Sequence, residues 1–219
     1  MESKREIRKL GFMVAMEIEA EPLIRHFSLE KSTVHGFDVY ENDDICLIIS
    51  EVGIINSTLA TYILIHDLKC RKIINYGVAG FTNESYRHCS VFSVGRVFKR
   101  DVDFTALGCE PYRFPDKPSY IQLEADSRLP ICDCYTSDEY IGPKSNVPKD
   151  VLVDMEAYCV AAVCEKYGIS CLIYKSISDI TANENTQEQI DTYLKSAVDA
   201  ICDYIIDKVL DKAPVCQGE

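Results

Sequence analysis

Acidic side chains at the ends of apolar segments are the residues of this sequence whose types and positions could do chemistry. The clearest is Asp179, which follows Ser178 at the end of an apolar run that begins after Gly168. Val151–Asp179 as a whole is predicted to contain acids, an apolar helix, a turn and a buried strand. In open α/β proteins, ligands bind beyond the carboxyl ends of such strands. Asp179 is therefore our first candidate catalytic residue, and the alternative is a helix cap for the polar loop that follows.

A second acid, Glu19, stands directly after a predicted buried strand, Leu10–Met16, at the start of a predicted helix. Glu17 and Glu21 lie beside it in the sequence. Acids in a first helical turn ordinarily complement the helix dipole. That structural role is the alternative to a chemical role for Glu19.

Other pairs of potential ligands do not predict a metal site. Asp101 and Asp103 are two residues apart, but no histidine or further acid cluster completes a ligand set. Solvated or subunit-interface acids are favoured for this pair. Cys132 and Cys134 alternate on a predicted strand without a second pair, which favours structural thiols over zinc ligands. The four histidines are scattered and suggest no site, so we expect no metal and no organic cofactor.

Alternating strand and helix patterns must position the acids. A hairpin is predicted over Val34–Ser50, and a helix follows from Gly53 with Leu59 and Tyr62 among its inward residues. A buried strand, Lys72–Tyr76, leads into the sequence GVAG, which predicts a tight turn that a ligand could approach closely. The first half of the chain therefore alternates between strands and helices.

The second half continues the alternation. Ser93–Gly108 begins as a strand, Pro111–Pro118 predicts a loop, and the last helix has apolar residues at three- and four-residue spacing over Ile190–Leu210. No linker or repeat divides the chain. We expect residues 1–219 to form a single α/β domain, a three-layer sandwich in which helices flank a central mixed sheet.

The composition argues against some classes of partner. The 23 basic and 35 acidic residues give a formal net charge of −12, which opposes nucleic acids and anionic membranes. No apolar stretch reaches membrane-spanning length. Eleven cysteines, an odd number, without a signal peptide favour reduced thiols. We therefore expect a soluble cytoplasmic protein that binds neither nucleic acid nor membrane.

Five blocks of sequence together carry a family resemblance. In chain order they are VAMEIEAEPL, IINYGVAG, RDVDFTALG, VDMEAYCVAAVCEKYG and SISD. They resemble the nucleoside phosphorylase superfamily and, within it, the 5′-methylthioadenosine/S-adenosylhomocysteine nucleosidases. The most specific part is DMEA, followed at the right interval by SD.

The resemblance implies a role for each matching residue. Glu19 stands where the family keeps the carboxylate that activates the attacking water. Met155 would lie against the ribose, and Glu156 would accept hydrogen bonds from the ribose hydroxyls. Ser178 and Asp179 would occupy the purine end, where Asp179 protonates N7 so that adenine can leave. An acid and a base with opposite protonation at one pH are expected.

Further positions follow from the same resemblance. In the segment DEYI, Tyr140 takes an aromatic position over the base, with core packing as an equal alternative, and the backbone of Ile141 is available to the purine edge. Asn75 stands where the phosphorylases place a phosphate-binding arginine. The substrate pocket also includes Val78 and Lys175, where the nucleosidases usually have Ser and Arg.

These features predict a purine nucleosidase that hydrolyses the N-glycosidic bond of 5′-methylthioadenosine, S-adenosylhomocysteine or a related adenine nucleoside. Without an arginine for phosphate, water is favoured as the nucleophile. The alternatives are a phosphate-dependent purine or uridine nucleoside phosphorylase and a catalytically silent nucleoside-binding protein. The resemblance also implies a homodimer, for which Asp101–Gly108 is the predicted interface segment.

Overall fold

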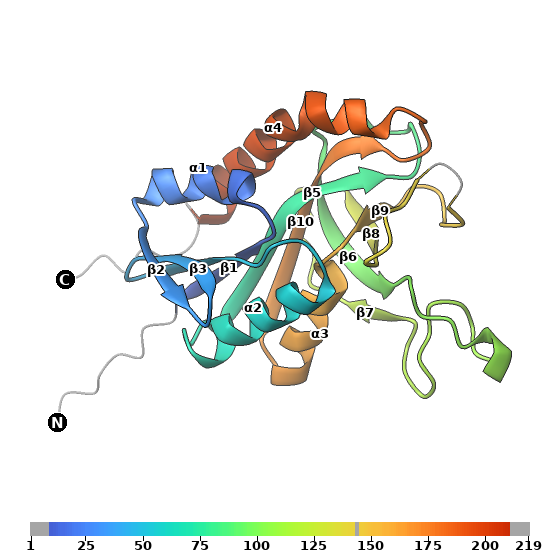
Figure 1. Ribbon diagram of the computed structural model, residues 1–219, viewed down its shortest axis with the longest axis horizontal. Helices are drawn as coiled ribbons and strands as arrows, with labels where there is room; N and C mark the ends of the chain where they lie inside the picture. The colour runs from blue at the N-terminus through green and yellow to red at the C-terminus, as the bar shows by residue number, and fades with distance from the viewer. Residues whose placement is uncertain (1–8, 143–144, 211–219) are drawn as a thin grey trace.

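A single mixed β-sheet forms the centre of the protein. The computed structural model describes residues 9–142 and 145–210, in which ten strands join one sheet. Figure 1 shows this sheet with helices on both sides. The strands are β1 (Leu10–Val14), β2 (Glu30–Val34), β3 (Phe37–Glu41), β4 (Ile45–Ile49), β5 (Lys72–Phe81), β6 (Val91–Lys99), β7 (Tyr120–Gln122), β8 (Ile131–Thr136), β9 (Leu152–Asp154) and β10 (Ser170–Ile180).

The strand order brings the candidate catalytic residues to one edge. It is β10-β6-β8-β9-β5-β1-β4-β3-β2, with β7 on β6 and a further pairing between β10 and β5. β4, β1, β5 and β10 run parallel as neighbours, so their carboxyl ends meet at the same edge. The additional β10–β5 pairing curls the other half of the sheet back on itself, which encloses the space beside β9.

Helices cover both faces, which confirms the predicted three-layer sandwich. In Figure 1, α1 (Glu17–Phe27) and α4 (Thr186–Tyr204) lie on one face, and α2 (Ile54–His66) and α3 (Ala157–Tyr167) lie on the other. A 3₁₀ turn, η1 (Thr105–Leu107), lies in the long loop after β6, and a π-helix, η2 (Ile205–Leu210), extends α4.

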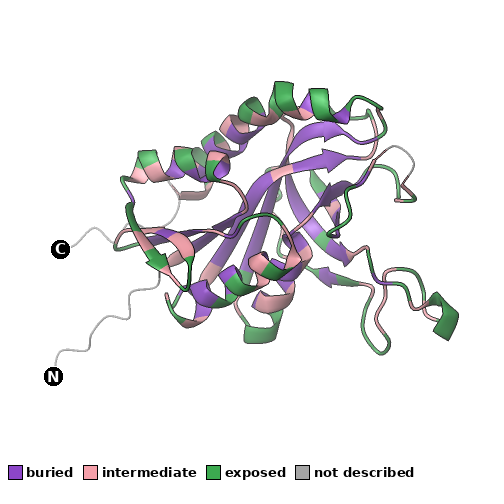
Figure 2. Ribbon diagram, in the orientation of Figure 1, coloured by how far each residue is buried: buried purple, intermediate pink, exposed green. Residues whose placement is uncertain are grey.

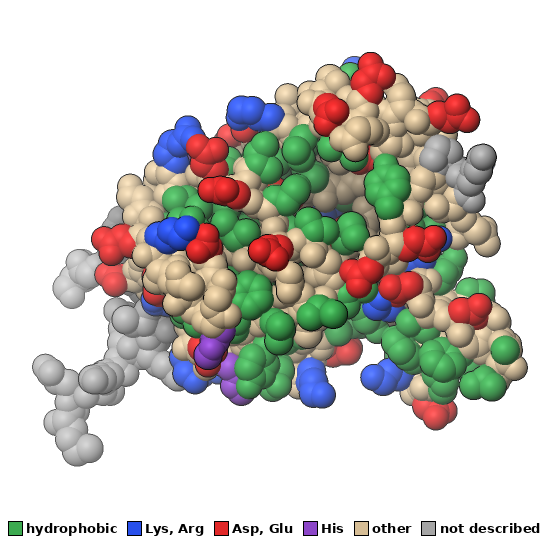
Figure 3. All heavy atoms as spheres, viewed as in Figure 1, with side chains coloured by type: hydrophobic (Ala, Val, Ile, Leu, Met, Phe, Trp, Pro, Cys, Tyr) green, Lys and Arg blue, Asp and Glu red, His purple; other side chains and the backbone are tan. Residues whose placement is uncertain are grey.

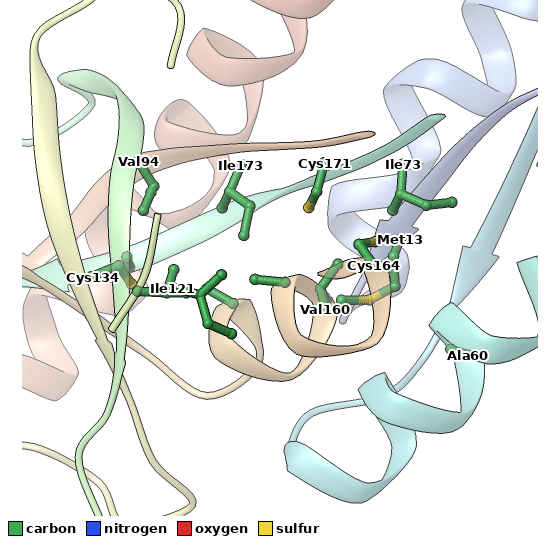
Figure 4. Close-up of a cluster of buried hydrophobic side chains, with 14 of the residues drawn as sticks. Met13, Ala60, Ile73, Val94, Ile121, Cys134, Val160, Cys164, Cys171 and Ile173 are labelled. Atoms are coloured by element: carbon green, nitrogen blue, oxygen red, sulfur yellow. The ribbon is translucent and has the colours of Figure 1, made fainter. Parts of the chain in front are cut away.

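Each helical layer has its own hydrophobic core against the sheet, as the buried strands of Figure 2 indicate. On the α1 and α4 side, Leu23 and Ile201 are fully buried in one cluster. On the other side, Val160 and Cys164 of α3 face Ile173 of β10 (Figure 4). Apolar area removed from water on both faces is the main source of stability.

Three details differ from the sequence-based expectations, beginning with the GVAG segment. It is not a turn, because β5 continues through it to Phe81. A Cβ added at Gly77 would lie 2.5 Å from Glu19 Oε1, and one at Gly80 would lie 2.6 Å from the Thr181 side chain. The glycines are therefore needed for close approach within a strand rather than for a change of chain direction.

The predicted hairpin over Val34–Ser50 belongs to a larger unit. β2 pairs antiparallel with β3, and β3 pairs with β4, so three strands form a meander. The sequence of β2, EKSTV, has one strongly apolar residue and no clear alternation, and this explains why it was missed.

The prediction of the inward face of α2 is also partly wrong. Leu59 and Tyr62 are 49% and 41% exposed, whereas Ala60, Ile63 and Leu64 are buried against the sheet and α3. Apolar residues occur on every side of this helix, so the pattern alone could not identify the buried side. None of the described helices combines the length and apolar character needed to cross a membrane.

Candidate active site

A cavity of about 170 Å³ opens at the carboxyl edge of the parallel strands. Figure 3 shows a recess near the centre of this face, bordered largely by hydrophobic side chains. The walls come from the ends of β1, β5, β9 and β10, from the loop before α2 and from the loop after β8. The lining residues are Ala15, Met16, Glu19, Val52, Val78, Ala79, Gly80, Glu139, Tyr140, Ile141, Val153, Asp154, Met155, Glu156, Ser178, Asp179 and Thr181.

Glu19 is held at one side of the cavity by three backbone donors. Its Oε2 accepts hydrogen bonds from the N–H groups of Ala15 (3.1 Å) and Met16 (3.0 Å), and its Oε1 accepts one from Val78 N–H (2.9 Å). The side chain is buried, and burial raises its pKa, although the positive charge of Lys175 and the three donors oppose that rise. Glu19 is thus a fixed carboxyl group with increased basicity.

Glu156 lies at the N-cap position of α3 and reaches across to the loop before α2. Its Oε1 accepts a hydrogen bond from Gly53 N–H at 2.9 Å. Burial, with the nearby negative charge of Asp154, raises the pKa of Glu156 to about 7, while Lys175 opposes the rise. Near neutral pH this side chain can therefore either donate or accept a hydrogen bond.

A buried ion pair joins Asp154, which lines the cavity, to Lys175, which does not. Lys175 Nζ is 2.8 Å from Asp154 Oδ2, and both side chains are almost completely inaccessible to solvent. Asp154 also accepts hydrogen bonds from Thr136 Oγ1 (2.6 Å) and Ala157 N–H (2.9 Å). Burial by itself would raise the pKa of Asp154 and lower that of Lys175. Their mutual attraction outweighs burial, so the pKa of Asp154 is lowered and that of Lys175 is raised.

Asp179 is buried at the end of β10, where the sequence placed it. Ser178 Oγ donates a hydrogen bond to Asp179 Oδ1 at 2.6 Å and lies 3.3 Å from Ala79 O. Burial raises the pKa of Asp179, while the Ser178 hydroxyl and the positive charge that His88 can carry oppose the rise. The strand end therefore favours a protonated carboxyl group, which is what a general acid needs.

The loop after β8 lines the cavity with Tyr140 and Ile141. Ile141 is buried and Tyr140 is 60% exposed, so core packing, the alternative considered for Tyr140, is wrong. Val78 lines the cavity as well. Met155 contributes to the wall next to Glu156.

Most of the predicted site residues surround this one cavity, but Lys175 does not line it. Its ammonium group is directed to Asp154, a residue that the sequence did not single out as functional. Gly53, the backbone donor to Glu156, was also missed. The sequence did carry a signal for the ion pair. Asp154 and Lys175 each lie within an apolar run, and a charge that is buried needs a partner.

The acids Asp101 and Asp103 lie away from the cavity. Asp101 forms an ion pair with Lys99, and Asp103 Oδ1 accepts a hydrogen bond from Thr105 N–H at 2.9 Å. Across residues 9–142 and 145–210, no group of three or more His, Cys, Asp and Glu side chains is arranged to hold a metal ion.

Replacement of Lys175 by Met should destabilise the protein strongly, because it leaves Asp154 buried without its cation. We expect a loss of about 3–5 kcal/mol in the free energy of unfolding. Lys195→Met is the control, since Lys195 pairs with Asp199 on the surface, where such a pair contributes at most about 1 kcal/mol. Urea denaturation measures both, and equal losses would contradict the assignment.

The raised pKa of Glu156 should make stability depend on pH. Between pH 4.5, the usual value, and about 7, the folded state retains a proton that the unfolded state has released, so stability falls as pH rises. The loss across this window should be on the order of 3 kcal/mol. Glu156→Gln, which cannot ionise, should remove this part of the pH dependence in denaturation curves at pH 4.5 to 8. If the free energies of unfolding of the wild type and of Glu156→Gln change with pH in parallel, the pKa of Glu156 is not raised.

Comparison with known proteins places this chain in a family. The model of the Phosphorylase superfamily matches residues 9–133 and 144–210. The chain is 25% identical to the aminodeoxyfutalosine nucleosidase of Helicobacter pylori (strain ATCC 700392 / 26695), covering 87% of this chain and 93% of that protein. It is 28% identical to the 5′-methylthioadenosine/S-adenosylhomocysteine nucleosidase of Exiguobacterium sp. (strain ATCC BAA-1283 / AT1b), covering 86% and 92%.

A solved structure has a similar fold. A mutant nucleosidase of Helicobacter pylori with 5′-methylthioadenosine in its active site superposes with a TM-score of 0.84 at 22% identity, covering 92% of this chain and 98% of that one. At this identity the likeness concerns the fold, whereas the family model matches the sequence over most of its length. The chain therefore belongs to the Phosphorylase superfamily.

Proposed function

We propose that the protein is a purine nucleosidase that hydrolyses the N-glycosidic bond of a 5′-substituted adenosine, such as 5′-methylthioadenosine or S-adenosylhomocysteine. The observation that carries the proposal is the pair of buried carboxyl groups, Glu19 and Asp179, that line one cavity in different environments. Several relatives of similar length have names that specify this activity. The aminodeoxyfutalosine nucleosidases among the relatives widen the range of candidate 5′ groups.

Asp179 is the general acid in this proposal. Cleavage of the N-glycosidic bond leaves negative charge on the base, which a proton delivered to N7 neutralises. Burial raises the pKa of Asp179 and thereby favours the protonated carboxyl group before the reaction. The hydrogen bond from Ser178 fixes the orientation of the carboxyl group.

Glu19 is the general base that takes a proton from the attacking water. Its three backbone hydrogen bonds hold the carboxylate still, and its raised pKa makes it a stronger base than an exposed glutamate. Met155 and Glu156 would bind the ribose, with the Glu156 carboxyl group hydrogen-bonded to the sugar hydroxyls. Tyr140 and Ile141 would cover the purine, and Val78 would lie near the sugar.

Hydrolysis is favoured over phosphorolysis by the charge of the cavity wall. Within the described part of the chain, no Lys or Arg side chain lines the cavity. Asn75, at the position of the phosphorylase arginine, is buried and donates to Met13 O at 3.0 Å, and Lys175 is paired with Asp154. A phosphate dianion would therefore meet buried acids without a compensating cation, which disfavours its binding.

Asp179→Asn should lower kcat for adenine release by about 10²–10⁴-fold, because Asn has no acidic proton to give. KM should change little, since the side chains are of equal size. The assay is adenine release from 5′-methylthioadenosine and S-adenosylhomocysteine in phosphate-free buffer, with Asp199→Asn on the surface of α4 as the control. Release by the wild type only after phosphate is added would favour a phosphorylase. Tight binding of the nucleoside without product would favour a binding protein.

We also propose that the protein acts as a homodimer in the cytoplasm and that residues 1–219 work as one domain. Exposed apolar side chains support the dimer, since Leu107 of η1, in the predicted interface segment, is 73% and Ile55 of α2 is 72% exposed. The ten cysteines within the described ranges are all free, as expected of a reducing compartment. Strands from β1 to β10 share one sheet, which supports a single domain.

Leu107→Asp should weaken the proposed dimer, because it places a charge in an apolar contact. Sedimentation velocity over a range of concentrations measures the effect as at least a tenfold increase in the dissociation constant. Ile131→Asp is the control, since Ile131 is similarly exposed on a different element, β8. A wild-type protein that is monomeric at every concentration would overturn the dimer proposal.

A further inference from the structure

The end of β10 is held in place by groups outside the cavity. A register shift interrupts the β10–β5 pairing between Ile177 and Asp179, so the ladder alone does not fix this segment. On the amino side, the loop before β6 provides two backbone hydrogen bonds, from Cys89 N–H to Ile177 O (2.8 Å) and from Ile177 N–H to Ser90 O (3.1 Å). These bonds fix the residue two positions before Asp179.

On the other side of Asp179, a buried side chain of α4 fixes the backbone by a hydrogen bond. Gln189 Oε1 accepts a hydrogen bond from Ile180 N–H at 3.0 Å, and Gln189 Nε2 donates to Asn185 Oδ1 at 3.0 Å. Gln189 is only 6% exposed. A neutral amide with both ends bonded has one favourable orientation, so Gln189 fixes the backbone next to the candidate acid.

His88 completes the arrangement. Its Nε2 lies 2.8 Å from Gln189 Oε1, and since that oxygen is an acceptor, Nε2 carries the hydrogen. The imidazole ring is stacked on Tyr193 of α4, with ring centroids 3.9 Å apart and ring planes 13° apart. His88 directly precedes the Cys89–Ser90 backbone that holds Ile177, so one short loop supports Asp179 from both sides.

Neither His88 nor Gln189 lines the cavity, so neither touches a bound substrate directly. We propose that Gln189 and His88 are positioning residues that hold the Asp179 carboxyl group at the purine, acting through the backbone of Ile180. The proposal rests on the proposed role of Asp179 as the general acid. A displacement of about 1 Å at such a group can cost on the order of 100-fold in rate.

One member of this pair, His88, also contributes to the electrostatics around Asp179. Apart from burial, the groups that act on the pKa of Asp179 are Ser178 on its own strand and His88 from the loop before β6. Gln189 of α4 is uncharged, and Gly80 of β5 has no side chain. A carboxylate at position 189 would form an ion pair with His88, whose Nε2 is 2.8 Å away, so the two charges would offset each other at Asp179.

Two substitutions at Gln189 separate positioning from packing. Gln189→Leu removes the acceptor for Ile180 N–H and should lower kcat for adenine release about 10- to 100-fold, with KM within about twofold of the wild type. Gln189→Glu keeps the acceptor oxygen, so it should retain a kcat within a few-fold of the wild type. A loss confined to KM, or equal losses of kcat in the two variants, would count against the proposal.

A matched pair of substitutions at His88 tests its role as hydrogen-bond donor to Gln189. His88→Gln can keep an N–H donor to Gln189 but loses the ring, and His88→Phe keeps the ring on Tyr193 but loses the donor. We expect His88→Gln to retain several-fold more kcat than His88→Phe. The opposite order would assign His88 a packing role only.

Amide hydrogen exchange tests the positioning without any enzyme assay. The Ile180 amide should exchange at least tenfold faster in Gln189→Leu than in the wild type, while the amide of Leu172, in the middle of β10, stays unchanged. An unchanged Ile180 rate would overturn the positioning proposal even if adenine release is confirmed. Faster exchange in a protein that releases no adenine would instead support the positioning of Ile180 by Gln189 and refute the proposed function.

Discussion

The burial of four carboxyl groups around one small cavity is the constraint on which the rest of the structure depends. A carboxylate removed from water is costly unless it is compensated, and each acid is compensated differently. Glu19 has three backbone donors, Asp154 has Lys175, and burial raises the pKa of both Glu156, to about 7, and Asp179. Different compensation gives the four carboxyl groups different affinities for a proton, which is what acid and base catalysis in one site requires.

The same constraint explains the small residues of β5. Gly77 leaves space for the Glu19 carboxyl group, and Gly80 leaves space for Thr181 and Asp179. In the β10–β5 pairing Lys175 lies opposite Gly77, so the buried cation and Glu19 occupy the same face of the sheet. The central strands therefore set the distances between charged groups, and glycine permits those distances by omitting a side chain.

The site combines a rigid edge with a more open side. Glu19, Glu156 and Asp179 are held by strand ends and by the start of a helix, where backbone donors are available. Val52 and Tyr140 lie at the open side and are largely exposed. Their exposed apolar surfaces can be covered by a ligand or by a second chain, so variation is expected there rather than at the acids.

Local patterns in the sequence determined the alternation of strands and helices, and with it the layered fold and the strand end that holds Asp179. Sequence blocks determined the membership of the family and most of the acids around the cavity. The tertiary structure alone decided the partner of Lys175, the continuation of β5 through Gly77, and the exposed side of α2 with Leu59. Each of these depends on residues distant in the chain, since an ion pair, a ladder or a buried face is defined by its partner. Gln189 shows the same limit, because its polar first turn gave no periodic signal and its bond to the strand exists only after α4 has packed.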